Sequence, residues 1–218
     1  MLTLEAVRPL SVALREGTTA EHEAAEHSSF MSELLAGRIN ADGYTDYLLR
    51  LRMIYTALED AVRAHRADPL LAAVYDPELE RLATLEADLA HWAAACGRET
   101  TEVPDSPAAR AYRDRLTDAD WPGALVAHHY TRYLGDLSGG QAIGALLNRA
   151  FDLDGAGLSF YRFPMRPKPY KDGYRARLDA LPLDADAIDT MVEEVKVAFH
   201  LNRALFDELA ANLTSYRR

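Results

Sequence analysis

The chain has 218 residues, of which 49% are hydrophobic and 27% are charged, and this composition is typical of a globular protein and excludes intrinsic disorder. Its 24 Lys and Arg residues are outnumbered by 34 Asp and Glu residues, and the net charge of −10 argues against general nucleic-acid binding, which requires a basic face. Because Cys96 is the only cysteine, a disulfide framework, a thiolate zinc site and an iron–sulfur cluster are excluded.

Apolar residues recur at helical spacing along almost the whole chain, and no convincing strand pattern with a period of two is present. Glycine, proline and capping residues divide this pattern into segments. We therefore expect an all-α fold of about eight helices, in a single domain over residues 1–218. The expected helices are 9–27, 28–37, 42–65, 76–97, 107–116, 121–151, 170–181 and 184–213, and residues 152–170 form one long irregular connection.

Nothing in the sequence predicts export or membrane insertion. Glu5, Arg8 and Arg15 interrupt any apolar core of a signal peptide in the first thirty residues. No run of eighteen apolar residues occurs, and the C-terminus carries no apolar anchor. We expect a cytoplasmic protein without a membrane partner.

Residues 130–144 contain an unusual density of glycine within a predicted helix. Gly135, Gly139, Gly140 and Gly144 should each cost about 1 kcal/mol relative to alanine, so something must offset this loss. The first and second are one turn apart, as are the third and fourth, which leaves two neighbouring strips of bare backbone. A close helix–helix crossing and a flat ligand lying against the backbone both explain such strips, and the sequence leaves both open.

Asp136 lies among these glycines in an apolar setting. A carboxylate there requires partners, and Arg132, one turn earlier, is one candidate. The spacing of the glycines does not match a phosphate-binding loop, because no strand precedes them and no Lys-Ser or Lys-Thr follows.

His22 lies in the first predicted helix, with small residues on its own face. Glu26, at i+4, can accept a hydrogen bond from the imidazole Nδ1–H, which would leave Nε2 free as a metal ligand. Arg15 lies about 10.5 Å along the same face. A histidine with a cation two turns away suits a planar iron cofactor that carries carboxylates, although an ordinary surface histidine remains an alternative.

The other histidines are weaker candidates for metal ligands. His128 and His129 are adjacent and cannot both face one ligand on a helix, so we interpret both as structural. A non-haem di-iron site would require paired Glu-x-x-His motifs, and the nearest approach in this chain is Asp88-x-x-His91.

Several motifs together resemble those of haem oxygenases of the soluble bacterial type. YTRYLGDLSGGQ at 130–141 resembles the distal-helix motif, and LREGTxxxH at 14–22 with Glu26 resembles the proximal-helix motif. FYRFP at 160–164, Tyr174-Arg175 and the segment 193–206 resemble later parts of the family. These matches occur in the family's order over about residues 10–213.

The resemblance implies a haem-oxygenase-like fold in which haem lies between a proximal and a distal helix. It also implies oxidative cleavage of haem to biliverdin, with release of CO and ferrous iron. Haem b would be both substrate and cofactor, O2 would be consumed, and the electrons would come from a ferredoxin with its reductase or from a flavin reductase. A local basic patch formed by Arg162, Arg166, Lys168 and Lys171 is one place where an acidic donor could dock.

The resemblance also assigns roles to individual residues. His22 is the axial iron ligand and Glu26 its partner, while Asp136 anchors a distal water network that Tyr55 and Arg132 support. The haem propionates meet Arg15, Tyr130, Lys171 and Arg175. The remaining haem contacts are Gly135, Ser138, Gly139, Gly140, Phe199, Asn202 and Phe206.

Two alternative functions remain open. A non-degrading haem carrier or sensor would use the same pocket, but storage does not need the proton relay that Asp136 implies. A thiamin-degrading enzyme of similar fold is opposed by His22 and by the position of Cys96 at a helix end. Departures from the family pattern are few: Gly17 replaces a common alanine, Arg15 replaces a common lysine, and Gly144 extends the glycine run.

Overall fold

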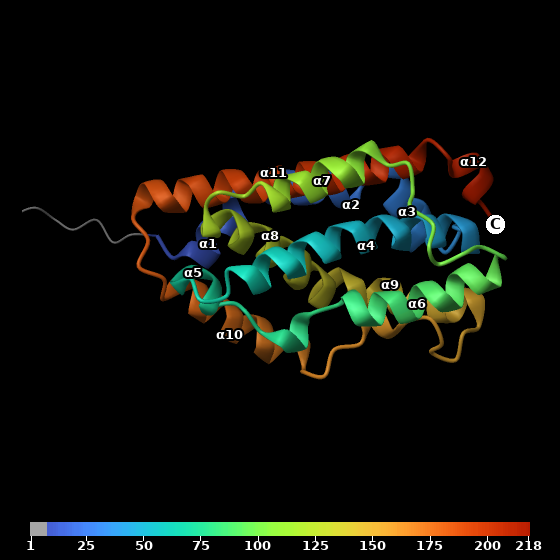
Figure 1. The fold of residues 1–218 in the computed structure, drawn as a ribbon, viewed down its shortest axis with the longest axis horizontal. Helices are drawn as coiled ribbons and strands as arrows, with labels where there is room; N and C mark the ends of the chain where they lie inside the picture. Colours follow the sequence, from blue (N-terminus) through green and yellow to red (C-terminus); the bar gives the residue numbers. More distant parts are fainter. Residues whose placement is uncertain (1–7) are drawn as a thin grey trace, which may run out of the picture.

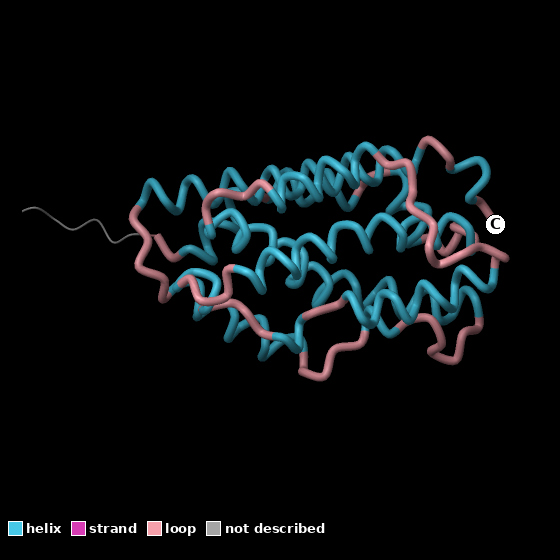
Figure 2. The backbone as a smooth tube through the Cα atoms, viewed as in Figure 1, coloured by secondary structure: helices cyan, strands magenta, loops and turns pink. Residues whose placement is uncertain are grey.

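The computed structural model describes residues 8–218, and the all-α expectation is confirmed: in this part of the chain helices are joined by loops and no strand is present (Figure 2). One isolated antiparallel bridge joins Ile39 to Arg217 near the C-terminus. The helices of the first half are α1 (Leu10–Gly17), α2 (Thr19–Glu26), α3 (Ser29–Leu35), α4 (Ala41–Ala64), α5 (Pro69–Ala72), the 3₁₀ turn η1 (Pro77–Leu79) and α6 (Leu82–Ala95). Those of the second half are α7 (Pro107–Thr117), α8 (Pro122–Gly135), the π-helical turn η2 (Asp136–Gly140), α9 (Gln141–Phe151), the 3₁₀ turn η3 (Ser159–Tyr161), α10 (Pro167–Asp179), α11 (Ala185–Ala210) and α12 (Leu213–Tyr216).

The two longest helices, α4 and α11, organise the packing (Figure 1). α4 contacts α6, α7 and α8, whereas α11 contacts α7, α8 and the N-terminal helices. The buried apolar side chains form one contiguous cluster, in which Trp92, Tyr44 and Tyr112 are among the largest that are fully buried. None of the helices described has the length and apolar composition that crossing a membrane requires.

The expected first helix is bent into α1 and α2 at Thr18, whose φ of −128° and ψ of 18° are not helical. The Thr18 hydroxyl donates to the carbonyl of Leu14 at 2.7 Å, and such back-bonding bends helices. Gly17 lies beside the bend, and a Cβ there would stand 2.7 Å from a methyl of Val192 on α11. The glycine therefore allows α1 to approach α11 closely, one turn before His22.

Several expected boundaries are shifted by proline or by a cap. The helix expected from residue 76 begins instead as the turn η1, and α6 starts only at Leu82. Asn40 caps α4 by accepting from the amide of Gly43 at 2.9 Å. The helix expected over 121–151 is continuous except for the π turn η2, which coincides with the glycine run. Insertions of this kind are common at functional sites.

Candidate functional site

A cavity of about 620 Å³ lies between α2 and the α8–η2–α9 helix and is flanked by α11. Its volume falls within the range of sites that enclose cofactor-sized molecules. The cavity brings together all but two of the residues that the sequence singled out. The predicted residues that line the cavity are Arg15, His22, Glu26, Tyr130, Arg132, Gly135, Asp136, Ser138, Gly139, Gly140, Arg175, Phe199, Asn202 and Phe206.

Tyr55 and Lys171 are the two predicted residues that do not line the cavity. Tyr55 is fully buried behind the wall, where its hydroxyl bonds to Asp136. Lys171 donates from Nζ to Ser138 Oγ at 2.6 Å, and Ser138 does line the cavity. Both residues therefore act on the cavity through a neighbour.

His22 projects from α2 with 54% of its side chain exposed, and its ring meets the ring of Phe199 edge-on at 5.5 Å between centroids. The structure shows no Nδ1–H bond to Glu26: the nearest approach of the Glu26 carboxylate to the ring is 3.7 Å, from Oε1 to Nε2. This separation is too long for a hydrogen bond.

The two strips of glycine have different environments. A Cβ added to Gly135 or Gly139 would meet nothing within 4 Å, so no helix crosses there and the bare backbone opens onto the cavity. A Cβ on Gly140 would come within 3.3 Å of the Tyr161 ring, and one on Gly144 within 3.0 Å of Tyr161 Cβ. Close packing thus explains the second strip, whereas the first leaves room for a ligand.

Asp136 stands at the start of η2 with only 8% exposure. The Tyr55 hydroxyl donates to Asp136 Oδ2, and it accepts from Arg132 Nε at 3.2 Å and Nη2 at 3.0 Å. Arg132 Nη1 donates to Asn202 Oδ1 at 2.7 Å. Arg132 was one candidate partner of Asp136, and the structure joins the two through Tyr55, because the arginine side chain bonds to Tyr55 on α4 and Asn202 on α11.

Burial raises the pKa of Asp136, while the charge of Arg132 and the hydrogen bond from Tyr55 oppose that rise. Burial also raises the pKa of Tyr55 well above 10, so the phenol keeps its proton and remains the donor in this bond. The chain Asn202–Arg132–Tyr55–Asp136 therefore holds one carboxylate against the cavity. Its other oxygen, Oδ1, is left for a group inside.

The mouth of the cavity carries positive charge. Arg15 and Arg175 both line it, with 69% and 40% of their side chains exposed. Tyr130 lines the cavity as well; burial raises the pKa of its hydroxyl, and the charges of Arg175 and Arg15 oppose this rise. A ligand that carries carboxylates at one edge fits such a rim.

The two adjacent histidines are structural, as expected. His128 is buried, with Nε2 2.9 Å from Glu194 Oε1, and His129 Nδ1 is 2.9 Å from the Tyr174 hydroxyl. Asp88 is not a metal ligand either: its carboxylate accepts from the amides of Ser159 and Phe160 at 2.8 and 2.7 Å and so caps η3. Within residues 8–218 no cluster of three such side chains could hold a metal ion.

Sequence reasoning missed some residues of the wall. Phe160 and Tyr161, in the motif at 160–164, line the cavity although no role was assigned to them, and Tyr47, Met31 and Ile143 line it too. The last three are apolar or aromatic side chains in helical patterns. Their spacing is that of ordinary core residues, so no sequence signal separated a cavity wall from a packed interior.

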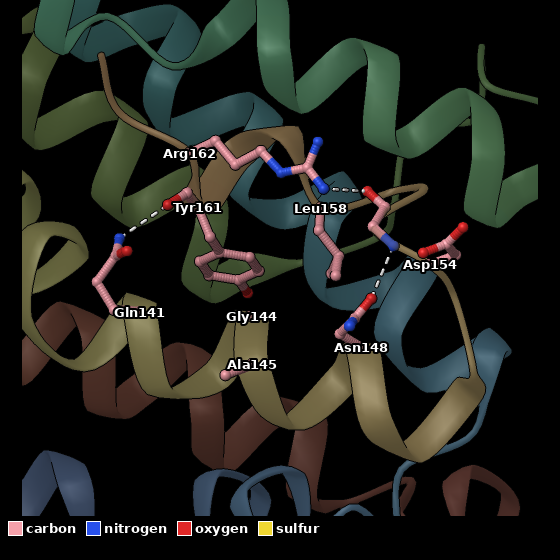
Figure 3. A pocket seen from close by; sticks show the side chains of 9 residues that line it. Gln141, Gly144, Ala145, Asn148, Asp154, Leu158, Tyr161 and Arg162 are labelled. Carbon is pink, nitrogen blue, oxygen red and sulfur yellow. Dashed lines mark hydrogen bonds between the residues drawn. The ribbon is translucent and has the colours of Figure 1, made fainter. Parts of the chain in front are cut away.

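A second, more open cavity of about 400 Å³ lies on the other side of α9 (Figure 3). Three of its polar side chains already have partners: Gln141 donates to the carbonyl of Tyr161 at 2.8 Å, Arg162 donates to the carbonyl of Gly155 at 2.8 Å, and Asn148 accepts from the Gly155 amide at 2.7 Å. It lacks the histidine, the buried carboxylate and the open backbone of the larger cavity.

Comparison with known proteins is consistent with this geometry. The family model described as Heme oxygenase matches residues 8–208. The chain is 41% identical to heme oxygenase 1 of Rattus norvegicus over 212 residues, which is 94% of this chain and 73% of the relative. It is 38% identical to heme oxygenase 2 of Synechocystis over 92% of this chain and 82% of the relative. The crystal structure of Synechocystis heme oxygenase-1 in complex with heme superimposes with a TM-score of 0.89 at 37% identity, covering 95% of each chain.

Proposed function

The chain belongs to the haem oxygenase family and cleaves haem to biliverdin, and we propose that it does so in the cavity between α2 and η2, with haem b as substrate and cofactor. The residues fit such a ligand. Gly135 and Gly139 leave a flat strip of open backbone, and cations at the mouth suit two propionates. His22 stands opposite and is the one histidine that lines the cavity among residues 8–218.

We assign His22 as the ligand of the haem iron, through Nε2. A neutral imidazole offers one nitrogen as acceptor while the other keeps its proton. Glu26 is largely exposed and makes no other ion pair with a described residue, so its carboxylate can turn toward Nδ1–H once Nε2 is occupied. In that position it would fix the tautomer and tune the strength of the bond.

On the opposite side the ionised Asp136 would hold the water through which a proton is delivered. The bound haem supplies the iron at which dioxygen is activated, and the electrons come from a partner. Asp136 Oδ1 is the acceptor for a water in the cavity, since Oδ2 is occupied by Tyr55. A water bound to this ionised carboxylate can pass a proton inward and take one in return from a second water on its outer side. The buried, bonded Asp136 is the observation that favours this function over a haem carrier, because storage needs no such relay.

The rim cations Arg15, Lys171 and Arg175, with the Tyr130 hydroxyl, would hold the two propionates. Arginine offers paired donors to a carboxylate, and lysine offers a point charge. Lys171 already reaches the cavity wall through Ser138. Phe206 and Met31 also line the cavity and would contact the apolar part of the ring.

The functional test is a spectroscopic titration of the protein with haem, followed by a reductant and air. A one-to-one complex whose Soret band disappears as biliverdin and CO form is the expected result. A stable complex that never loses its Soret band would instead support the carrier function. Asp136→Asn keeps an acceptor for Tyr55 and should bind haem normally but lose most biliverdin formation, which separates binding from turnover.

For the electron donor we propose an acidic ferredoxin or a flavin reductase that docks at the exposed residues Arg166 and Lys168, next to the rim lysine, in a cytoplasmic setting. Lys168 pairs with Asp172 at 2.9 Å, so Arg166 is the simpler residue to test. Arg166→Glu should slow turnover with reduced ferredoxin at low salt and leave turnover with ascorbate unchanged. Arg113→Glu, on the surface of α7, serves as the matched charge reversal.

A further inference from the structure

Two hydrogen bonds join the first turn of α1 to the last residue of α10. Asp179 Oδ1 accepts from the backbone amide of Ser11 at 2.7 Å, and Oδ2 accepts from the Ser11 hydroxyl at 2.9 Å. Ser11 is only 9% exposed and the two residues are 168 positions apart in the chain. The contact therefore fixes two distant helices against each other, where they also pack side by side.

The location of Asp179 is unfavourable for its own helix. A carboxylate at a helix C-terminus faces the negative end of the helix dipole, and α10 ends at this residue. The same carboxylate lies at the N-terminus of α1, where a free backbone amide and a positive dipole end stabilise it. An aspartate here is explained by the contact between helices and not by α10 alone.

The register of this contact relates it to the cavity. Arg15 is four residues after Ser11 on α1, and Arg175 is four residues before Asp179 on α10. Residues four apart lie on one face of a helix, about one turn along it. Both arginines line the cavity mouth, so the Ser11–Asp179 contact lies one turn behind each of them.

We propose that Ser11 and Asp179 are positioning residues that set the spacing of Arg15 and Arg175, and thereby the in-plane rotation of the haem and the carbon bridge at which it is opened. The inference rests on the proposed binding of the haem propionates by these two arginines. Two carboxylates at one edge of a rigid ring meet two cations whose separation is fixed, and this match selects one rotation. Release of the contact lets the cations spread, and other rotations become populated.

The test is Asp179→Ala, with Ser11→Ala as a milder second variant. Each is compared with wild type for haem affinity, for the paramagnetically shifted methyl signals of the ferric cyanide complex, and for the biliverdin isomers. We expect the ratio of the main isomer to the others to fall about tenfold, since small displacements strongly change reactivity. Additional methyl signals should appear, and the haem dissociation constant should rise no more than about fivefold, as for an exposed ion pair. Asp179→Asn, which can still pair with both Ser11 groups, should restore the wild-type pattern.

Asp184→Ala is the matched control, because Asp184 caps α11 by accepting from the Ala187 amide at 2.9 Å and lies outside the cavity. It should lower stability without changing the signals or the isomers. Wild-type signals and isomers in both Asp179→Ala and Ser11→Ala would overturn the proposal. A separate variant tests the propionate assignment on which this proposal rests. If Arg175→Ala changes neither the haem affinity nor the ratio of biliverdin isomers, that assignment is wrong.

Discussion

The hydroxyl of Tyr55 on α4 donates a hydrogen bond to Asp136 on the π turn, and the same hydroxyl accepts two hydrogen bonds from Arg132. A neutral phenol thus separates a buried cation from a buried carboxylate. Because Arg132 does not touch Asp136, the carboxylate is oriented without being neutralised by a direct salt bridge. Its free oxygen remains a usable base at the cavity.

Tyr55→Phe should leave haem binding intact and slow biliverdin formation by about 10- to 100-fold, which corresponds to one hydrogen bond to a charged group. The bond from Tyr55 lowers the pKa of Asp136 against the larger effect of burial, so its removal raises that pKa further. Activity that needs ionised Asp136 is lost as the pH falls through this pKa. The acidic limb of a single-turnover pH profile should therefore move to higher pH; a slower rate with an unmoved limb would contradict this role.

Gly139→Ala should impair haem binding or turnover without lowering stability, whereas Gly144→Ala should lower stability. The first adds a methyl where nothing lies within 4 Å, so stability should be unchanged or rise by up to about 1 kcal/mol, while haem binding or turnover is impaired. The second places a methyl 3.0 Å from Tyr161 Cβ, which cannot easily move, and should lower stability by about 1–3 kcal/mol. Urea unfolding without haem and a haem titration measure the two effects. Normal haem affinity and turnover in Gly139→Ala would remove the argument that the open strip faces the ligand.

His22→Ala should retain part of the haem affinity, since the rim cations and the apolar wall remain, but it should lose normal turnover. The absorption spectrum of the haem complex should change with the iron ligand, and added imidazole should restore it in part. His27→Ala is the control, because His27 is exposed on the same segment, bonds through Nδ1 to the carbonyl of Glu23, and does not line the cavity. Undiminished turnover in His22→Ala would contradict the ligand assignment.

The sequence predicted the helices and most of the cavity residues for different reasons. Apolar periodicity predicts helices wherever one face is buried, which is why 42–65 and 184–213 lie close to the observed α4 and α11. Periodicity does not predict the bend at Thr18. The bend depends on the Thr18 hydroxyl, which bonds back to its own helix, and on the close approach of Gly17 to Val192. The sequence does not indicate the π turn either, because η2 is a single turn inside a helix and the apolar residues Leu137, Ile143 and Leu147 continue through it.

The site was predicted where local spacing carries the signal and missed where it depends on tertiary contacts. The glycine strips and His22 could be read from single helices. The bond between Tyr55 and Asp136, and the wall residues Tyr47 and Tyr161, require knowledge of which helices face each other. Tyr55 was named through the resemblance to haem oxygenases, because periodicity alone does not tell which helices pack against each other.

Away from the cavity, Glu194 joins α11 to α7 and α8 and should make stability depend on pH. Burial opposes its ionisation, but hydrogen bonds with His128 and Arg115 outweigh this and lower the pKa of Glu194 to about 2. Since the folded-state pKa lies below the ordinary 4.5, the stabilisation is complete above about pH 4.5 and is lost as the pH falls from there toward 2. Burial lowers the pKa of His128 too, so below about 6.5 the unfolded chain binds a proton that the folded one does not, which adds to the loss.

Glu194→Gln should therefore lower the free energy of unfolding by about 1–3 kcal/mol at pH 7, with a difference from wild type that shrinks as the pH approaches 3. Urea unfolding at pH 7, 5 and 3.5 measures this trend. The neighbouring Glu193→Gln removes an exposed pair with Lys196 and should change stability by no more than about 0.5 kcal/mol at any of these pH values. Two results would contradict this role of Glu194: an equal loss of unfolding free energy in the two variants, or a difference between Glu194→Gln and wild type that grows as the pH falls. Only a buried, paired carboxylate stabilises the fold above about pH 4.5 and loses that stabilisation below it.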